Sequence, residues 1–323
     1  MTLKAVLALA LLVLAACAAA TGKRAGSEAR SAEERWPPIG RFVDVDGTRV
    51  HAYVAGSGPD LVLIHGASGN LRDWTFRFAE RMTDRYRVIA FDRPGLGYTE
   101  RLPGYGSAFN AGAESPQEQA ALLARAATKL GVSNPVVVGH SFGGAVAMAW
   151  ALDHDPAALV VVSGATMPWP GDLGAQYAVL GSSVGGALLA PVVAATAGET
   201  RIDEAVATIF APQAAPEGYL DYVGAGLTLR PASLRANARQ VNTLRPHVVE
   251  MSRRYPSLRL PVELVHGDAD EIVPLDIHSR RLADILPDAR LTVLDGIGHM
   301  PHQVAPQPVE DAIDRAARRA GLR

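Results

Sequence analysis

The spacing of apolar residues along the chain predicts short buried strands that alternate with helices. Six runs rich in Val, Leu and Ile are separated by segments of helix length, and each run has the length of a strand. Continuous apolar strands in this rhythm are typical of a parallel sheet with helices on both faces. The runs are residues 61–64, 88–91, 135–138, 159–162, 262–265 and 291–294.

Two further strands are expected at the start of the folded region. Residues 41–45 and 48–54 alternate between apolar and polar side chains on either side of Asp46-Gly47, a pair that strongly favours a tight hairpin turn. The predicted fold class is therefore α/β, with an eight-stranded, mostly parallel sheet. Helices are expected over residues 71–82, 115–130, 142–154, 277–286 and 308–320.

The rhythm of strands stops between Ser163 and Leu260. Apolar helical sequence punctuated by Gly and Pro takes over there, which indicates an inserted subdomain rather than further strands of the sheet. We assign residues 39–165 and 255–323 to the core of the fold. Residues 166–254 are assigned to a helical lid.

One stretch of this lid, residues 178–197, is apolar enough to raise the question of a membrane segment. Gly181, Gly185, Gly186 and Pro191 make it a poor spanning helix. A lid helix is the favoured interpretation. Contact of this stretch with a bilayer or with acyl chains is left open.

The N-terminus has the layout of a secretion signal. Lys4 precedes an apolar run over residues 5–14, which is short for a membrane span. The run ends in Leu14-Ala15-Ala16-Cys17, which resembles the lipobox of bacterial lipoproteins, and Cys17 is the only cysteine. We expect residues 1–16 to be a lipoprotein signal peptide and Cys17 to be lipidated.

This assignment predicts a membrane-anchored lipoprotein of the bacterial cell envelope, on the periplasmic or outer-membrane face. Cleavage near residues 18–20 without lipidation is the alternative. Residues 17–38 are expected to form a flexible tether that follows the lipidated cysteine, since the segment lacks apolar periodicity.

Composition and charge limit the classes of partner that are expected for the 323-residue chain. Its hydrophobic content of 48% is ample for a sizeable core, and its formal net charge is −2. With no basic stripe, nucleic acid is not an expected partner. The sequence has no metal-ligand spacing, phosphate-binding loop or dinucleotide fingerprint, so neither a metal nor a cofactor is expected. A small-molecule substrate fits this composition, and no obligate protein partner is implied.

Ser141 is the strongest candidate for chemistry. It lies between Gly139 and the pair Gly143-Gly144, directly after an apolar strand. A strand that runs straight into a helix turns sharply at such a serine, and glycines leave room for that turn. A nucleophile elbow is the favoured interpretation, and a plain Gly-rich turn is the alternative for this motif alone.

A serine hydroxyl needs a general base and a group that orients the base. Asp270 follows a predicted strand, and His299 lies in a Gly-rich loop after the last one. The order along the chain is serine, acid, histidine. Asp268 and Glu271 are rival acids, and His302, three residues after His299, is the rival base.

From about Arg41 onward, the chain resembles a lidded, serine-nucleophile member of the α/β-hydrolase superfamily. The resemblance rests on the elbow, the order of the three groups and the Gly-x-x-Asp-x-Ile-Val-Pro loop that begins at Gly267. It implies that Ser141 is the nucleophile, that His299 is the base and that Asp270 orients it.

The same resemblance implies an oxyanion hole made of two backbone amides. These are the amides of Phe142, which follows the nucleophile, and Ala67, which follows His65-Gly66. The loop that begins at Asp92-Arg93 resembles a part of the family that is mostly structural.

The resemblance implies a cofactor-independent serine hydrolase. A carboxylic ester hydrolase, similar to a carboxylesterase or lipase, is expected to act on a small or medium apolar substrate. Hydrolysis of amides, lactones or carbon–carbon bonds remains open. A serine nucleophile argues against haloalkane dehalogenases and epoxide hydrolases, which use aspartate. A surface lipoprotein that binds a ligand in a relict hydrolase pocket is the alternative of another class.

Overall fold

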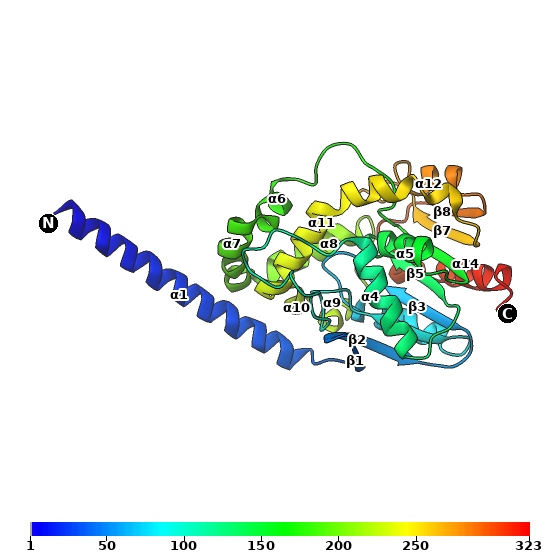
Figure 1. Ribbon diagram of the computed structural model, residues 1–323, viewed down its shortest axis with the longest axis horizontal. Coiled ribbons are helices and arrows are strands. Elements are labelled where there is room, and N and C mark those ends of the chain that lie inside the picture. Colours follow the sequence, from blue (N-terminus) through cyan, green and yellow to red (C-terminus); the bar gives the residue numbers. More distant parts are fainter. Residues whose placement is uncertain (1) are drawn as a thin grey trace.

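A single eight-stranded sheet organises the fold (Figure 1). The structure is a computed structural model that describes residues 2–323. The strand order is β1-β2-β4-β3-β5-β6-β7-β8, with antiparallel pairing of β2 to β1 and β4 and parallel pairing elsewhere. The predicted fold class and strand count are confirmed. The strands are β1 (Arg41–Val45), β2 (Thr48–Ala55), β3 (Asp60–Ile64), β4 (Arg87–Phe91), β5 (Val136–His140), β6 (Ala158–Val162), β7 (Val262–Gly267) and β8 (Ala289–Leu294).

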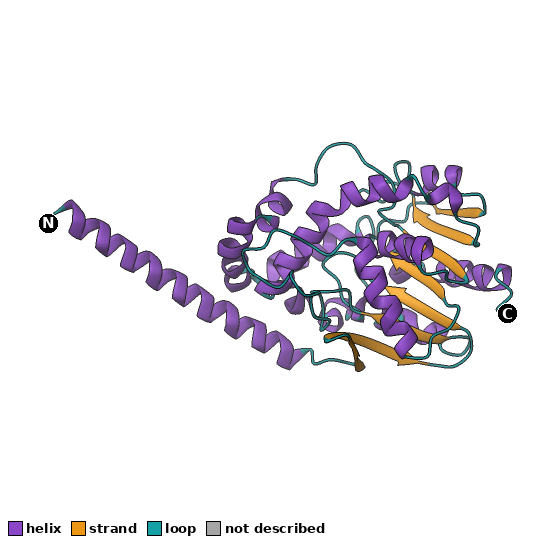
Figure 2. Cartoon of the chain, viewed as in Figure 1, coloured by secondary structure: helices purple, strands orange, loops and turns teal. Residues whose placement is uncertain are grey.

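The central strands are buried because helices cover both faces of the sheet (Figure 2). In β3, Val62 and Ile64 face one cluster, whereas Leu61 and Leu63 face the other, as the two-residue period of a strand requires. Helices α4, α5 and α12 contribute to the first cluster, and α3 and α14 to the second. The core helices are α2 (Arg72–Thr75), α3 (Phe78–Met82), α4 (Pro116–Lys129), α5 (Phe142–Asp153), α12 (Ser279–Ile285), α13 (Pro301–Val304) and α14 (Pro306–Arg319).

One expected core helix is interrupted. The sequence predicts one helix over residues 71–82, but the chain leaves helical geometry at Arg77, whose φ is −148°. Phe76 turns instead to pack edge-on against Tyr219, with 5.4 Å between the ring centroids. Tyr219 belongs to the lid, so a contact distant in sequence overrides the local helical preference.

The lid is an insertion between β6 and β7, where the described chain forms helices and no strand. Its longest helix, α11, packs against α6 and α7 on one side and approaches the core on the other. A single 3-10 turn, Tyr255–Ser257, leads back to β7. The lid helices are α6 (Ala175–Gly181), α7 (Ser183–Thr196), α8 (Glu199–Phe210), α9 (Tyr219–Val223), α10 (Ala225–Leu229) and α11 (Pro231–Ser252).

The N-terminal segment differs from the flexible tether expected over residues 17–38. Helix α1 (Leu3–Arg35) is continuous through most of that stretch. Its small side chains allow close approach to the lid: Ala25 is buried against Ala194 and Ala195 of α7. The indole Nε1 of Trp36 donates a hydrogen bond of 2.6 Å to the carbonyl oxygen of Asp221. The lid therefore supplies the packing surface that the sequence did not reveal.

The first half of α1 projects away from the body of the molecule (Figure 1). Within residues 2–323, α1 is the single unbroken helix long and apolar enough to cross a membrane. Its most apolar window has a mean hydropathy of 2.5 and no buried residue. Helices α6 and α7 meet the same criterion only when taken together, and they are bent by 104°.

Candidate active site

The sharp turn expected at Ser141 is present between β5 and α5. Ser141 has φ 53° and ψ −119°, a conformation that is costly for a residue with a side chain. A Cβ atom on Gly139 would lie 2.2 Å from the carbonyl oxygen of Gly143, and one on Gly143 would lie 2.3 Å from that of Ile64. Glycine is required at both positions because backbone atoms fill the space.

Asp270 and His299 form a buried pair beside this turn. His299 Nδ1 lies 2.8 Å from Asp270 Oδ2. The other carboxylate oxygen accepts hydrogen bonds of 2.9 Å from the amides of Ile272 and Val273. Burial raises the pKa of Asp270, but hydrogen bonds from His266 and His299 outweigh it and hold that pKa well below its usual range. Asp270 is therefore an ionised acceptor that fixes the His299 ring.

The rival acids lie elsewhere in the same loop. Asp268 Oδ1 accepts a hydrogen bond of 2.7 Å from the amide of Gly296, so it ties the acid loop to the loop that carries His299. Glu271 is exposed. Of the three carboxylates considered from the sequence, the structure brings Asp270 to His299.

A further contact ties the elbow to the histidine loop. His140, the residue before Ser141, donates a hydrogen bond of 2.9 Å from Nε2 to the carbonyl oxygen of His299. The two imidazole ring centroids are 4.9 Å apart. Within the described chain, no hydrogen bond joins the Ser141 hydroxyl to the His299 ring, although the two residues lie on loops in contact.

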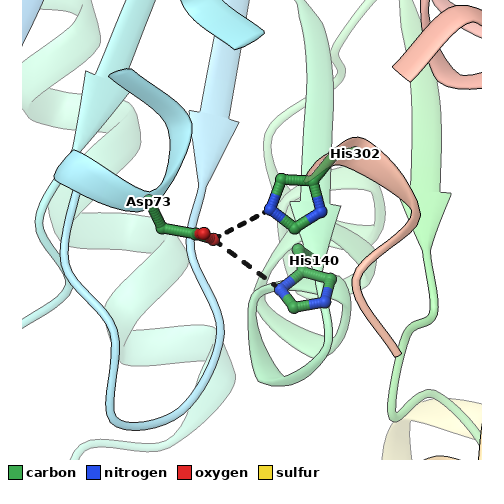
Figure 3. A group of neighbouring side chains, drawn as sticks. All are labelled: Asp73, His140 and His302. Atoms are coloured by element: carbon green, nitrogen blue, oxygen red, sulfur yellow. Dashed lines mark hydrogen bonds and ion pairs between the residues drawn. The ribbon is translucent and has the colours of Figure 1, made fainter. Parts of the chain in front are cut away.

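A second buried network joins Asp73, His140 and His302 (Figure 3). His302 Nε2 lies 3.0 Å from Asp73 Oδ2, and His140 Nδ1 lies 4.0 Å from the same oxygen. The hydroxyl of Tyr219 donates to the other Asp73 oxygen at 2.8 Å. The rival base His302 is thus paired with Asp73 and not with Asp270. No local pattern in the sequence points to Asp73, because Asp73 meets the two histidines only in the folded chain.

Asp73, His140 and His302 are the described residues that could hold a metal ion, since their ligand atoms all lie within 4.8 Å of one another. One carboxylate and two imidazoles suit a transition metal. As they stand, Asp73 and His302 are at hydrogen-bonding distance. Burial raises the pKa of Asp73, but the interactions with His302, His140 and Tyr219 outweigh it and lower that pKa.

The two amides expected to bind an oxyanion have no acceptor within the described chain. Phe142 begins α5, where an amide has no partner inside the helix. Ala67 lies in a loop that passes close to the elbow, because a Cβ on Gly66 would lie 3.0 Å from Ser141 Cβ. Both amides therefore lie near the serine and remain available to an added acceptor.

Hydrogen bonds to the Gly66 carbonyl fix the orientation of the Ala67 amide, because the two belong to the same peptide group. The carbonyl oxygen of Gly66 accepts hydrogen bonds from His65 Nδ1 at 2.8 Å and from Arg93 Nη2 at 2.9 Å. In a trans peptide the carbonyl and the following N–H point in opposite directions. Two donors on Gly66 thus direct the N–H of Ala67 away from Arg93.

His65 is suited to this task as a neutral ring. Its Nε2 accepts a hydrogen bond of 3.0 Å from the backbone amide of Arg93, so the proton of the neutral ring resides on Nδ1. Burial, assisted by the charge of Arg93, lowers the pKa of His65 to about 4. The ring therefore keeps one donor and one acceptor at neutral pH, each with a partner.

Arg93 is a functional candidate that sequence reasoning missed. Its guanidinium is fully buried and also donates to the carbonyl oxygen of His65 at 3.0 Å. Further donors reach Gln119 at 3.0 Å and Gln240 at 2.9 Å. The guanidinium carbon lies 4.2 Å from the centroid of the Phe142 ring. Burial lowers the pKa of Arg93 to about 9, although Glu114 acts to raise it.

Side chains of the lid hydrogen-bond to the loop that carries the Ala67 amide and to the loop that carries His299. Asn237 of α11 accepts a hydrogen bond of 2.7 Å from the amide of Ser68 and donates one of 2.9 Å to its hydroxyl. Gln213 donates to the carbonyl oxygen of Gly296 and accepts from the amide of Gly298, at 2.6 and 2.9 Å. Ser141 is only 8% exposed in this state.

The Asp73 network leads to a prediction about acid stability. The folded-state pKa of Asp73 lies below the value of about 4 in an unfolded chain. The ionised carboxylate therefore stabilises the fold above that pH, and the stabilisation is lost as the pH falls through the folded-state pKa. In Asp73→Asn, we expect a free energy of unfolding lower by about 1–3 kcal/mol at pH 7 and a weaker dependence on pH between 5 and 3.

Urea unfolding at a series of pH values measures both effects. The matched control is Asp295→Asn, at an exposed carboxylate in the histidine loop, and we expect it to follow the unsubstituted chain. An equal slope with pH in the Asp73→Asn and unsubstituted chains would contradict the prediction.

Comparisons with known proteins place these features in context. A family model described as "Alpha/beta hydrolase family" matches residues 61–312. An uncharacterized protein of Mycobacterium tuberculosis is 27% identical over 290 residues, which cover 86% of this chain and 81% of that protein.

Solved structures show the same fold. An alpha/beta hydrolase fold protein from Burkholderia ambifaria has a TM-score of 0.68 and 24% identity, and the match covers 85% of this chain and 97% of that one. An esterase from Rhodococcus sp. ECU1013 has a TM-score of 0.63 and 24% identity, with coverage of 86% and 99%.

Proposed function

Because this chain belongs to the alpha/beta hydrolase family, we propose that it is a serine hydrolase that cleaves carboxylic esters and acts on a small or medium apolar substrate. The observation that supports this most is the buried Asp270–His299 pair beside a serine held in a strained turn. Strain at a serine between glycines is hard to explain as ordinary turn structure. An esterase among the fold neighbours is compatible with this proposal.

In the proposed reaction, the Ser141 hydroxyl oxygen attacks the ester carbonyl carbon and its proton passes to His299 Nε2. That nitrogen is free to accept because Nδ1 donates its proton in the hydrogen bond to Asp270. The tetrahedral intermediate then collapses, and the alcohol leaves with the proton from His299. Water repeats the sequence on the acyl-enzyme, which releases the acid and restores Ser141.

The carbonyl oxygen becomes an anion in both tetrahedral states. We propose that the amides of Ala67 and Phe142 bind it, since neither has another acceptor in the described chain. Arg93 acts as a positioning residue: it holds the Gly66 carbonyl and packs on the Phe142 ring, so it contacts both amide-bearing segments.

We also propose that the protein is a lipoprotein anchored through Cys17. The proposal rests on the lipobox-like residues before Cys17, the exposed position of that cysteine and the apolar helix that leads to it. The site itself does not require the anchor.

Ser141→Ala tests the nucleophile. Loss of the proposed nucleophilic oxygen should reduce hydrolysis of a p-nitrophenyl ester by about 10⁴-fold or more, and a fluorophosphonate probe should no longer label the chain. Ser163→Ala is the matched control, because Ser163 is a buried serine that follows the neighbouring strand β6, and labelling should persist there. Unchanged turnover in Ser141→Ala would refute the proposal.

Arg93→Lys tests the positioning of the oxyanion loop. Lysine keeps the charge but lacks the planar set of donors that reach several carbonyl oxygens. We expect kcat to fall by about 10²-fold while KM changes little, because the lost interaction acts mainly in the transition state. Arg87→Lys is the control, since Arg87 also donates to two backbone carbonyls, those of Leu130 and Gly131, outside the candidate site. Equal losses of kcat in the two variants would contradict this role.

Cys17→Ser tests the anchor. In the bacterial host, the unsubstituted chain should yield an N-terminal peptide that begins at Cys17 and carries the mass of its acyl chains. The variant should retain residues 1–16, because lipid transfer to the cysteine precedes cleavage of such signals. An unmodified N-terminus near residues 18–20 in the unsubstituted chain would favour simple secretion instead.

A further inference from the structure

Helix α7 of the lid buries its small residues and exposes its large ones. Gly186, Ala190 and Ala194 face the protein and are buried. Val184 and Leu188 face outward with exposed fractions of 62% and 61%. A helix on the surface of a water-soluble domain shows the reverse arrangement, with its large apolar side chains against the core. The outer face of α7 is therefore suited to contact with an apolar phase.

The exposed side chains form one continuous stripe. Val184, Leu188 and Val192 recur every four residues and so share one side of the helix. No charged residue occurs in the sequence between Asp172 and Glu199. We name this surface the lid patch; it consists of Val179, Val184, Leu188, Leu189 and Val192. An uncharged apolar surface of this kind marks an interaction site.

The lid patch adjoins the N-terminal helix. Ala25 of α1 packs against Ala194 and Ala195 near the end of α7, and α7 lies at the end of the body that α1 passes (Figure 1). The apolar half of α1 is wholly exposed. Lys23 and Arg24 lie between this half and the packed residues, where basic side chains reach lipid headgroups.

We propose that the lid patch rests on the bilayer that holds the N-terminal anchor, so that ester substrates dissolved in the membrane enter the lid from the lipid phase. The contact between the lid patch and the bilayer concerns the surface alone. The entry of substrates from the lipid phase rests on the function proposed above. A bilayer that holds the lipid on Cys17 lies beside the stripe, because the part of α1 that follows Cys17 packs against α7. The anchor keeps the patch at high local concentration near the membrane, so a modest apolar area suffices for contact.

The path from the lid patch to the candidate site is short. Ala190 of α7 packs on Ala238 of α11. The adjacent residue on α11, Asn237, holds Ser68 in the loop that carries the Ala67 amide. A single helix, α11, thus separates the proposed lipid contact from the loop that carries the Ala67 amide.

Quenching by brominated lipid measures the contact itself. The membrane-anchored chain is reconstituted in phosphatidylcholine–phosphatidylglycerol vesicles with brominated acyl chains, with a tryptophan introduced by Leu188→Trp. The matched control is Val293→Trp, at an exposed apolar residue on strand β8 of the core. We expect quenching beyond that of the unsubstituted chain for Leu188→Trp and none for Val293→Trp. Equal quenching of the two variants overturns the proposal.

Kinetics measure the consequence for substrates. Leu188→Asp should lower hydrolysis of p-nitrophenyl decanoate carried in the vesicles by about tenfold, the effect of losing one leucine side chain from an apolar phase, and leave hydrolysis of soluble p-nitrophenyl acetate unchanged. Unchanged acetate hydrolysis also shows that the variant folds. Val293→Asp should alter neither rate. An equal loss on both esters in Leu188→Asp overturns the lipid route.

The remaining outcomes separate the alternatives. A dimer of the unsubstituted chain in detergent that Leu188→Asp dissociates would assign the patch to a second copy and overturn the bilayer contact. If Ser141→Ala retained full activity, the proposed function would fail while the quenching result still decided the surface. The two proposals therefore fail by different measurements.

Discussion

The buried guanidinium of Arg93 connects the parts of the molecule that the candidate site needs. It has no carboxylate partner at hydrogen-bonding distance in the described chain, so neutral acceptors must satisfy its donors. Those acceptors come from the loop after β3, from Gln119 on α4 and from Gln240 on α11. The same group packs on Phe142 at the start of α5. The Arg93 guanidinium thus holds the sheet, the lid and the elbow together through its hydrogen bonds and its contact with Phe142.

Much of this organisation was predictable because it depends on local pattern. The strands follow from continuous apolar runs. Glycine spacing and chain order pointed to Ser141, Asp270 and His299 as candidates, and the structure pairs the last two. Arg93 and Asp73 were not predictable, since their partners lie more than twenty residues away in sequence. Residues 17–38 were predicted to be a flexible tether for the same reason. The helix in this segment packs against a lid surface that is distant in the sequence.

Two carboxylate–imidazole pairs lie near the elbow, each in contact with His140. Asp270 orients His299, whereas Asp73 pairs with His302. His140 joins them, with one ring nitrogen on the carbonyl oxygen of His299 and the other facing Asp73. Burial and the neighbouring His302 and His299 hold the pKa of His140 well below its usual value. The ring is therefore neutral, and its donor to His299 fixes the tautomer.

The hydrogen bonds between Asn237 and Ser68 have a kinetic meaning. They join α11 to the loop that carries the Ala67 amide, and the serine beneath is nearly inaccessible. Any displacement of α11 that admits a substrate stretches these bonds and disturbs the loop. Entry of a substrate and ordering of the loop that carries the Ala67 amide are then separate steps.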